Sequence, residues 1–142
     1  MAEFIMKDMV NKRGLANEFF IVSSATSDEE IRNGVGNRMY PPAQAELRCN
    51  GIPFEPRRAT RLVASDYGKY DLLIGMDSAN IRNMHRILGG DPENKIHKLM
   101  EYTSIPTDVS DPWYSDRFDI AFNDIAKGCK GLIDALIKQG RI

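Results

Sequence analysis

The sequence predicts an α/β protein whose parallel sheet is flanked by helices. The run YDLLIGMD at 70–77 is apolar between charged ends, which is typical of a strand covered on both faces. A helical pattern follows at 78–88, and a longer one closes the chain at 120–138. Strands that alternate with helices favour parallel pairing through crossover connections.

The remaining elements are predicted from local patterns of apolar, β-branched and turn-forming residues. The polar loop in the first half is unusually long, and such loops in compact domains are often functional. In chain order we expect a helix at 1–13, a buried strand at 18–25, the long loop at 26–42, a helix at 42–49, an extended piece at 52–62, a turn or short helix at 64–70, a strand at 95–102 and a loop at 105–118.

Composition and charge restrict the class of protein. The 142 residues suit one domain, 1–142, and 42% of them are hydrophobic. A net charge of -1 argues against general binding to nucleic acid or acidic membranes. The chain has no apolar run long enough to span a bilayer and no secretory signal at its start. Its two cysteines are predicted to be free thiols, and we expect a cytoplasmic protein.

Four separated segments together resemble the low-molecular-weight protein tyrosine phosphatases. Their order and spacing fit that family across nearly the whole chain. The segments are MAEFIMKDMV, FFIVSSATSDEEI, YDLLIGMD with NIRNMHRILGGDPE, and SDPWYSDRFDIAFNDI. The resemblance implies a flavodoxin-like phosphatase fold without a cofactor. It also implies hydrolysis of phosphotyrosine in proteins, or of small aryl phosphates, through a phosphocysteine.

The start of the sequence departs from that family. Members begin with a buried strand and a Cys-(x)5-Arg-Ser-Pro loop, which holds the phosphate, and then continue into a helix close to MAEFI. We therefore expect the central first strand and the loop, roughly 15 residues by family analogy, to be missing before Met1. Cys49 is followed six residues on by Glu55, and Cys129 by Ala135, so neither cysteine supplies the motif. This chain is predicted to be inactive as it stands.

Asp111 is the strongest catalytic candidate. The run Asp111-Pro112-Trp113-Tyr114 matches the family loop whose aspartate protonates the leaving phenolate and then helps to activate water. Without the resemblance, Asp111 would more simply cap a helix with Pro112 in its first position. The resemblance also implies that Trp113 and Tyr114 form an aromatic wall against the substrate ring, the alternative being plain packing.

Other positions carry weaker implications of the resemblance. Ser23 matches a serine that hydrogen-bonds beneath the phosphate loop, although a serine that simply ends a strand is equally compatible. Glu29 stands where many relatives have an aromatic residue, and Tyr40 could substitute for it. No histidine has partners at metal-ligand spacing, so we expect no metal site. Arg57, Arg58 and Arg61 form a small basic group, for which an anion site is the less favoured interpretation.

Two further interpretations stay open. One is a non-catalytic binding or oligomerising module derived from the same fold, and the other is a relative of the arsenate reductases. The missing first strand would leave backbone groups unpaired between 18–25 and 70–77, and such groups are costly when buried. The flanking strands could pair directly, another copy could pair with the exposed sheet edges to give a homo-oligomer, or part of the chain could stay unfolded.

Overall fold

The computed structural model describes residues 1–27, 31–32 and 35–142, with the backbone alone for Ile31, Arg32, Trp113 and Tyr114. Short 3-10 helices stand between the longer elements. In chain order the elements are α1 (Ala2–Lys12), η1 (Ala16–Glu18), β1 (Ile31–Arg32), β2 (Val35–Gly36), α2 (Pro41–Cys49), η2 (Ala64–Gly68), β3 (Leu73–Gly75), α3 (Ser78–Leu88), β4 (Ile96–Lys98), η3 (Leu99–Tyr102), α4 (Pro112–Ser115) and α5 (Phe118–Lys138).

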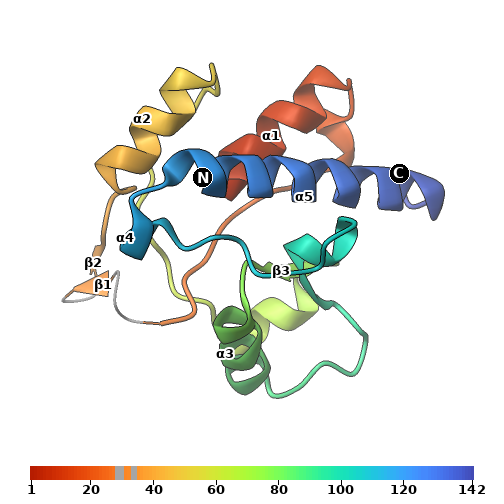
Figure 1. The fold of residues 1–142 in the computed structure, drawn as a ribbon. Helices are drawn as coiled ribbons and strands as arrows, with labels where there is room; N and C mark the ends of the chain where they lie inside the picture. Colours follow the sequence, from red (N-terminus) through yellow and green to blue (C-terminus); the bar gives the residue numbers. More distant parts are fainter. Residues whose placement is uncertain (28–30, 33–34) are drawn as a thin grey trace.

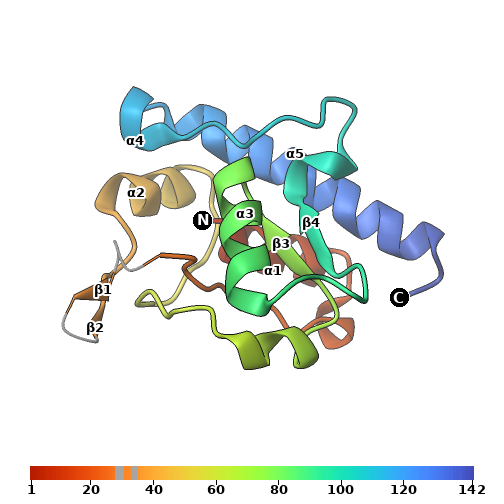
Figure 2. The ribbon, with the colours of Figure 1, turned by 90° about the horizontal axis from the view of Figure 1, so that it is seen from below.

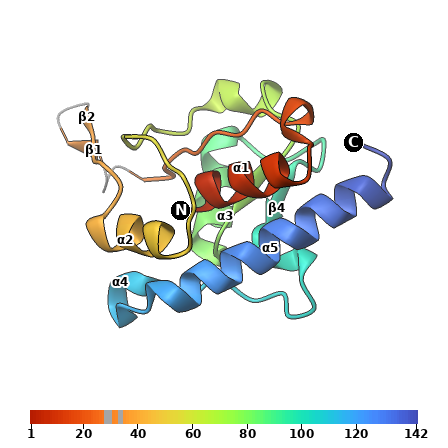
Figure 3. The same ribbon diagram turned by 90° about the horizontal axis from the view of Figure 1, so that it is seen from above.

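The predicted α/β class is confirmed by a parallel pair of strands between helices. β3 and β4 pair in parallel, with Leu73 opposite Ile96 and Gly75 opposite Lys98. Figure 1 places α5 and α1 on one side of β3 and α3 on the other. Seen from below, α3 covers β3 and β4, and the view from above shows α1 and α5 side by side (Figures 2 and 3).

Alternating side chains of β3 face two separate apolar clusters. Ile74 packs against the larger cluster, which α1 and α5 build from residues such as Ile5 and Ile133. Leu73 belongs to the smaller cluster, together with Met84 of α3. The strand is therefore covered on both faces, as its continuous apolar sequence predicts.

The predicted helices form where the apolar periodicity places them. α3 begins after Asp77, whose carboxylate accepts a hydrogen bond from the backbone N–H of Asn80 at 2.7 Å. It ends at Gly89, which adopts a φ of 77°, a left-handed conformation that glycine accommodates easily. In the part of the chain that the structure describes, no helix is long and apolar enough to cross a membrane.

The predicted buried strand at 18–25 is wrong. Residues 20–24 belong to no strand, and only Ala25 forms an isolated bridge, with Arg61. Within the described ranges, the backbone groups of Phe20, Ile21 and Val22 have no hydrogen-bond partner. The Phe20 side chain is 77% exposed. High β-propensity makes a strand only where a neighbouring strand supplies the ladder, and no described segment does so here.

Three other predicted elements differ in extent. The predicted strand at 95–102 is β4 followed by η3, because the Glu101 side chain accepts a hydrogen bond from the Lys98 N–H at 2.8 Å and turns the chain. The long loop at 26–42 contains the antiparallel pair β1–β2. The loop at 105–118 contains α4, which begins directly after Asp111.

Candidate active site

Asp111 lies at the surface, immediately before α4. Pro112 occupies the first position of that short helix, and the Ser115 hydroxyl donates to the Asp111 carbonyl at 3.4 Å. The side chain is exposed, so a ligand can reach it. This position is compatible both with a helix cap and with a general acid. The hydrogen bonds of the three residues before Asp111 fix where its loop lies.

Asp108 attaches the Asp111 loop to the edge of the parallel sheet. One carboxylate oxygen accepts hydrogen bonds from the Ser78 N–H and hydroxyl, each at 3.1 Å, and from Lys98 Nζ at 2.8 Å. The hydrogen bond from Lys98, together with those from Ser78, holds the pKa of the Asp108 carboxyl below its usual value. Ser78 follows β3 and Lys98 ends β4, so the loop lies at the carboxyl ends of both strands. In open α/β sheets that edge is where ligands bind.

Two backbone groups complete this attachment. The Val109 N–H donates to the Met76 carbonyl at 3.0 Å, and the Ser110 N–H donates to the Asp124 carboxylate at 3.1 Å. Three successive residues before Asp111 are thus bound to different parts of the fold. Such multiple attachment reduces the freedom of the loop and fixes the position of Asp111 at its end.

Ser23 belongs to a second cluster, around the buried carboxylate of Glu3. The Ser23 hydroxyl donates to Glu3 at 2.6 Å, Lys7 Nζ lies 2.6 Å from the other oxygen, and Arg57 Nε lies 2.7 Å from the first. Arg57 also donates to the Ser23 carbonyl at 2.6 Å. These bonds join the extended segment, the first turn of α1 and the chain after α2.

Glu3 stays ionised in this setting. Burial alone would raise the pKa of its carboxyl, but the hydrogen bonds from Lys7 and Ser23 and the charge of Arg57 outweigh burial and lower the pKa. Its partners balance the buried charge, which would otherwise be costly.

The two clusters converge on the first turn of α3. Asn80 Nδ2 lies 3.4 Å from the Thr26 hydroxyl, three residues after Ser23. Asn80 also accepts a hydrogen bond from the Met76 N–H at 3.0 Å, beside the carbonyl that holds Val109. The segment that carries Ser23 and the loop that carries Asp111 therefore meet the same strand-to-helix junction.

Neither cysteine has the surroundings of a phosphate-binding nucleophile. Cys129 is 2% exposed, and burial raises the pKa of its thiol to about 12. Cys49 is exposed and is the last residue of α2, so it does not lie among the free N–H groups at the beginning of a helix. A catalytic cysteine requires the opposite environment, at the beginning of a helix and among N–H donors.

The remaining predicted site residues are placed as follows. Trp113 and Tyr114 lie in α4, and their side chains fall outside what the structure describes. Glu29 also lies outside the described residues. Tyr40 precedes α2, and its ring packs against Phe118 at a centroid distance of 5.8 Å.

Asp108, Asp124 and the role of Glu3 were not predicted from the sequence. The spacing of Glu3 and Lys7 could have indicated their pairing, because residues four apart are neighbours on a helix. No motif in the local sequence marks Asp108 as the residue that attaches this loop to the sheet. The bond from Ser110 to Asp124 joins residues 14 positions apart, and only the fold brings them together.

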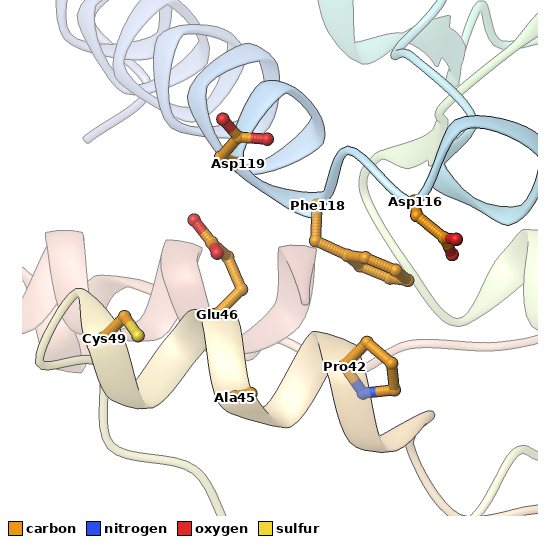
Figure 4. A pocket seen from close by; sticks show the side chains of 7 residues that line it. All are labelled: Pro42, Ala45, Glu46, Cys49, Asp116, Phe118 and Asp119. Atoms are coloured by element: carbon orange, nitrogen blue, oxygen red, sulfur yellow. The ribbon is translucent and has the colours of Figure 1, made fainter.

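An acidic cavity of about 280 Å³ lies between α2 and the beginning of α5. Figure 4 shows Glu46 directed from α2 toward α5, where Asp119 lies, with Cys49 at one end of the cavity and Asp116 at the other. Asp119 is paired with Arg117, but Glu46 and Asp116 still make the lining acidic. Because like charges repel, this cavity does not suit the phosphate ester that the sequence predicts as substrate.

The parallel strands, with the Asp111 loop fixed at their carboxyl ends, define an α/β protein. Comparisons with known proteins identify the family. The family model described as "Low molecular weight phosphotyrosine protein phosphatase" matches residues 1–141, and the chain belongs to this family. The resemblance stated from the sequence is thereby confirmed.

Individual relatives agree with this assignment. The low molecular weight protein-tyrosine-phosphatase YfkJ of Bacillus subtilis is 29% identical over 144 residues, which cover 100% of this chain and 90% of the relative. PtpA of Staphylococcus saprophyticus is 27% identical, over 100% of this chain and 88% of its own. The crystal structure of YfkJ superposes with a TM-score of 0.87 at 28% identity, covering 97% of this chain and 86% of that one. The low molecular weight phosphatase of Streptococcus pyogenes gives 0.81 at 29% identity, covering 95% and 82%.

Proposed function

We propose that residues 1–142 provide the acid-bearing part of a protein tyrosine phosphatase site, with Asp111 as the general acid. The substrate would be a phosphotyrosine protein or a small aryl phosphate. The observation that carries this proposal is the attachment of the Asp111 loop, through Asp108, to the carboxyl ends of β3 and β4. Trp113 and Tyr114 would form the aromatic wall next to the acid, and Ser23 would support the phosphate-binding part from the Glu3 cluster.

We also propose that residues 1–142 do not hydrolyse phosphate esters by themselves. A phosphocysteine mechanism needs a thiolate held among N–H donors beside an arginine. Cys129 is buried with a pKa of about 12, and Cys49 stands at the wrong end of a helix. In this proposal the nucleophile and the phosphate-binding loop come from a Cys-(x)5-Arg segment outside these residues.

Turnover of p-nitrophenyl phosphate tests both statements. We expect no rate above background from residues 1–142, and a measurable rate when a family strand and Cys-(x)5-Arg-Ser-Pro loop are fused before Met1. In that active chimera, Asp111→Asn should lower kcat by roughly 10²–10⁴-fold. The matched control is Asp116→Asn, since Asp116 is exposed and has a φ of 56°, which asparagine tolerates. Equal kcat values for the Asp111 and Asp116 variants would show that Asp111 is not the general acid.

A second candidate function is a non-catalytic module that associates with other copies. The unpaired backbone of Phe20–Val22 and the 77% exposed Phe20 side chain favour it, because open extended segments can pair with another chain. Light scattering after gel filtration should then show a homo-oligomer that Phe20→Ser weakens, while Ile105→Ser, at a side chain 66% exposed, does not. A monomer at every concentration would contradict this candidate.

The cytoplasm is the compartment that we propose for either function. Both cysteines are free, and Cys49 is exposed. An exposed thiol without a disulfide partner suits a reducing compartment. Cell fractionation with a tagged chain would test the location, and recovery outside the cytoplasmic fraction would contradict it.

A further inference from the structure

A cavity of about 500 Å³ lies on the other side of α2 from the acidic one. Residues from α2, the segment before it and the segment after it surround it. Its lining consists of Arg38, Met39, Gln44, Arg48, Ile52, Pro53, Phe54, Glu55, Pro56 and Arg57. This volume lies in the range of small-molecule sites, which combine an apolar lining with a few polar groups.

The apolar wall of this cavity is held in place from two directions. The Phe54 ring packs edge-on against Phe4 of α1, with centroids 6.1 Å apart. The guanidinium carbon of Arg48 lies 5.2 Å from the centroid of the same ring. Figure 3 shows the beginning of α1 beside the end of α2, which explains how both helices reach Phe54. A ring fixed in this way loses little entropy when a ligand packs on it.

The polar wall is likewise organised before any ligand arrives. Gln44 donates its side-chain N–H to the Met39 carbonyl at 2.6 Å, which fixes the chain where it enters α2. Arg57 is already bound to Glu3 and Ser23. The charge of Arg57 is therefore largely compensated, and its contribution to a ligand is small.

Arg38 and Arg48 supply the available positive charge. Within the described part of the chain, neither guanidinium makes an ion pair with a carboxylate. Glu55 is the one acidic residue of the lining, so these two arginines outnumber it. A guanidinium recognises carboxylate and phosphate groups through paired N–H donors.

We propose that this cavity binds a small anion with an apolar body, such as an aromatic or aliphatic carboxylate or an organic phosphate. The anionic group would lie between Arg38 and Arg48, and the apolar body would pack on Phe54 and Met39. The site is separate from Asp111 and does not depend on the proposed phosphatase activity. Through Arg57 it adjoins Glu3 and Ser23, so an occupied cavity is positioned to influence that cluster.

Chemical-shift mapping on ¹⁵N-labelled residues 1–142 tests the proposal with benzoate as the probe. Benzoate should shift the amides of Met39, Gln44 and Phe54 and the side-chain Nε–Hε signals of Arg38 and Arg48. Benzamide, which has the same ring without the charge, should bind at least about fivefold more weakly, because charge-assisted hydrogen bonds are the stronger ones. Equal binding of benzoate and benzamide, or benzoate shifts centred elsewhere, would overturn the proposal.

Matched variants test whether Arg38 and Arg48 bind the anionic group. Arg48→Gln and Arg38→Gln should each weaken benzoate binding by about fivefold or more, while Arg82→Gln, an exposed arginine of α3, should not. The dispersed spectrum of each variant reports that it is folded. Equal loss in all three variants would mean non-specific attraction and would refute the site.

Two further probes distinguish the sources of the anion. Inorganic phosphate at matched concentration tests whether charge alone suffices, and shifts as strong as those from benzoate would contradict a role for the apolar wall. Hexanoate compared with benzoate tests whether the body must be aromatic, and binding of either one supports the proposal. If an acidic peptide binds at the cavity and benzoate does not, the small-anion proposal is wrong and the cavity belongs to a peptide-binding surface.

Discussion

The Ser23 hydroxyl donates a hydrogen bond of 2.6 Å to the buried carboxylate of Glu3. This bond joins the end of an extended segment without strand pairing to the first turn of α1. Together with the hydrogen bond from Arg57, it restrains residues 20–24, which lack the backbone hydrogen bonds of a strand. The stability of this region therefore depends on one ionised side chain.

Glu3→Gln should lower the free energy of unfolding by about 1–2 kcal/mol, because it leaves Arg57 without its ionic partner in a partly buried position. Urea unfolding followed by circular dichroism measures this change. Asp134→Asn is the matched control, since the Asp134 side chain is 48% exposed and its pairs with Arg13 and Lys130 lie at the surface. An equal decrease in both variants would contradict a special role for Glu3.

The free energy of unfolding should decrease in acid, partly because the Glu3 carboxylate becomes protonated. The lowered pKa of Glu3 means that its contribution is complete above the unfolded value of about 4.3 and is lost as the pH falls through the folded value. Glu3→Gln should therefore show a shallower decrease in stability between about pH 4.3 and pH 3 than the unmodified chain. Urea midpoints measured across this range compare the two proteins. If both midpoints decrease equally with pH, Glu3 does not contribute to the loss of stability in acid.

The two thiols should react very differently with N-ethylmaleimide. Cys49 is exposed, whereas Cys129 is 2% exposed and burial raises its pKa to about 12. Mass spectrometry of the native chain should show a single adduct, with the second appearing only in urea. Cys49→Ser should remove the native adduct, and rapid double labelling without denaturant would show that Cys129 is accessible.

Gly131→Ala should destabilise the fold despite its position in a helix. An added Cβ would lie 2.0 Å from the Tyr102 carbonyl oxygen, so α5 and η3 would have to separate. We expect the steric cost to exceed the helix-propensity gain of about 1 kcal/mol, which leaves a net loss of stability of about 1–3 kcal/mol. Gly68→Ala is the control, since a Cβ there meets nothing within 4 Å. Thermal unfolding of both variants tests this, and unchanged stability of Gly131→Ala would contradict it.

The helices were predictable because their apolar periodicity is local. α3 spans the predicted 78–88, and α5 begins two residues before the predicted 120. The failure of residues 20–24 to form the predicted strand could not be foreseen from their β-branched residues, because pairing depends on a neighbour elsewhere in the chain. In the same way, the Asp-Pro-Trp-Tyr motif predicts a role for Asp111, but only the folded chain brings Asp108 to Ser78 and Lys98.

The attachments of the Asp111 loop have a consequence for how this protein can change. Met76, Ser78, Lys98 and Asp124, which hold the three preceding residues, all come from the C-terminal half of the sequence. Substitutions in α1 or in the extended segment can therefore accumulate while Asp111 keeps its location. The Glu3 cluster and the Asp111 loop could then be remodelled independently, by evolution or in the laboratory.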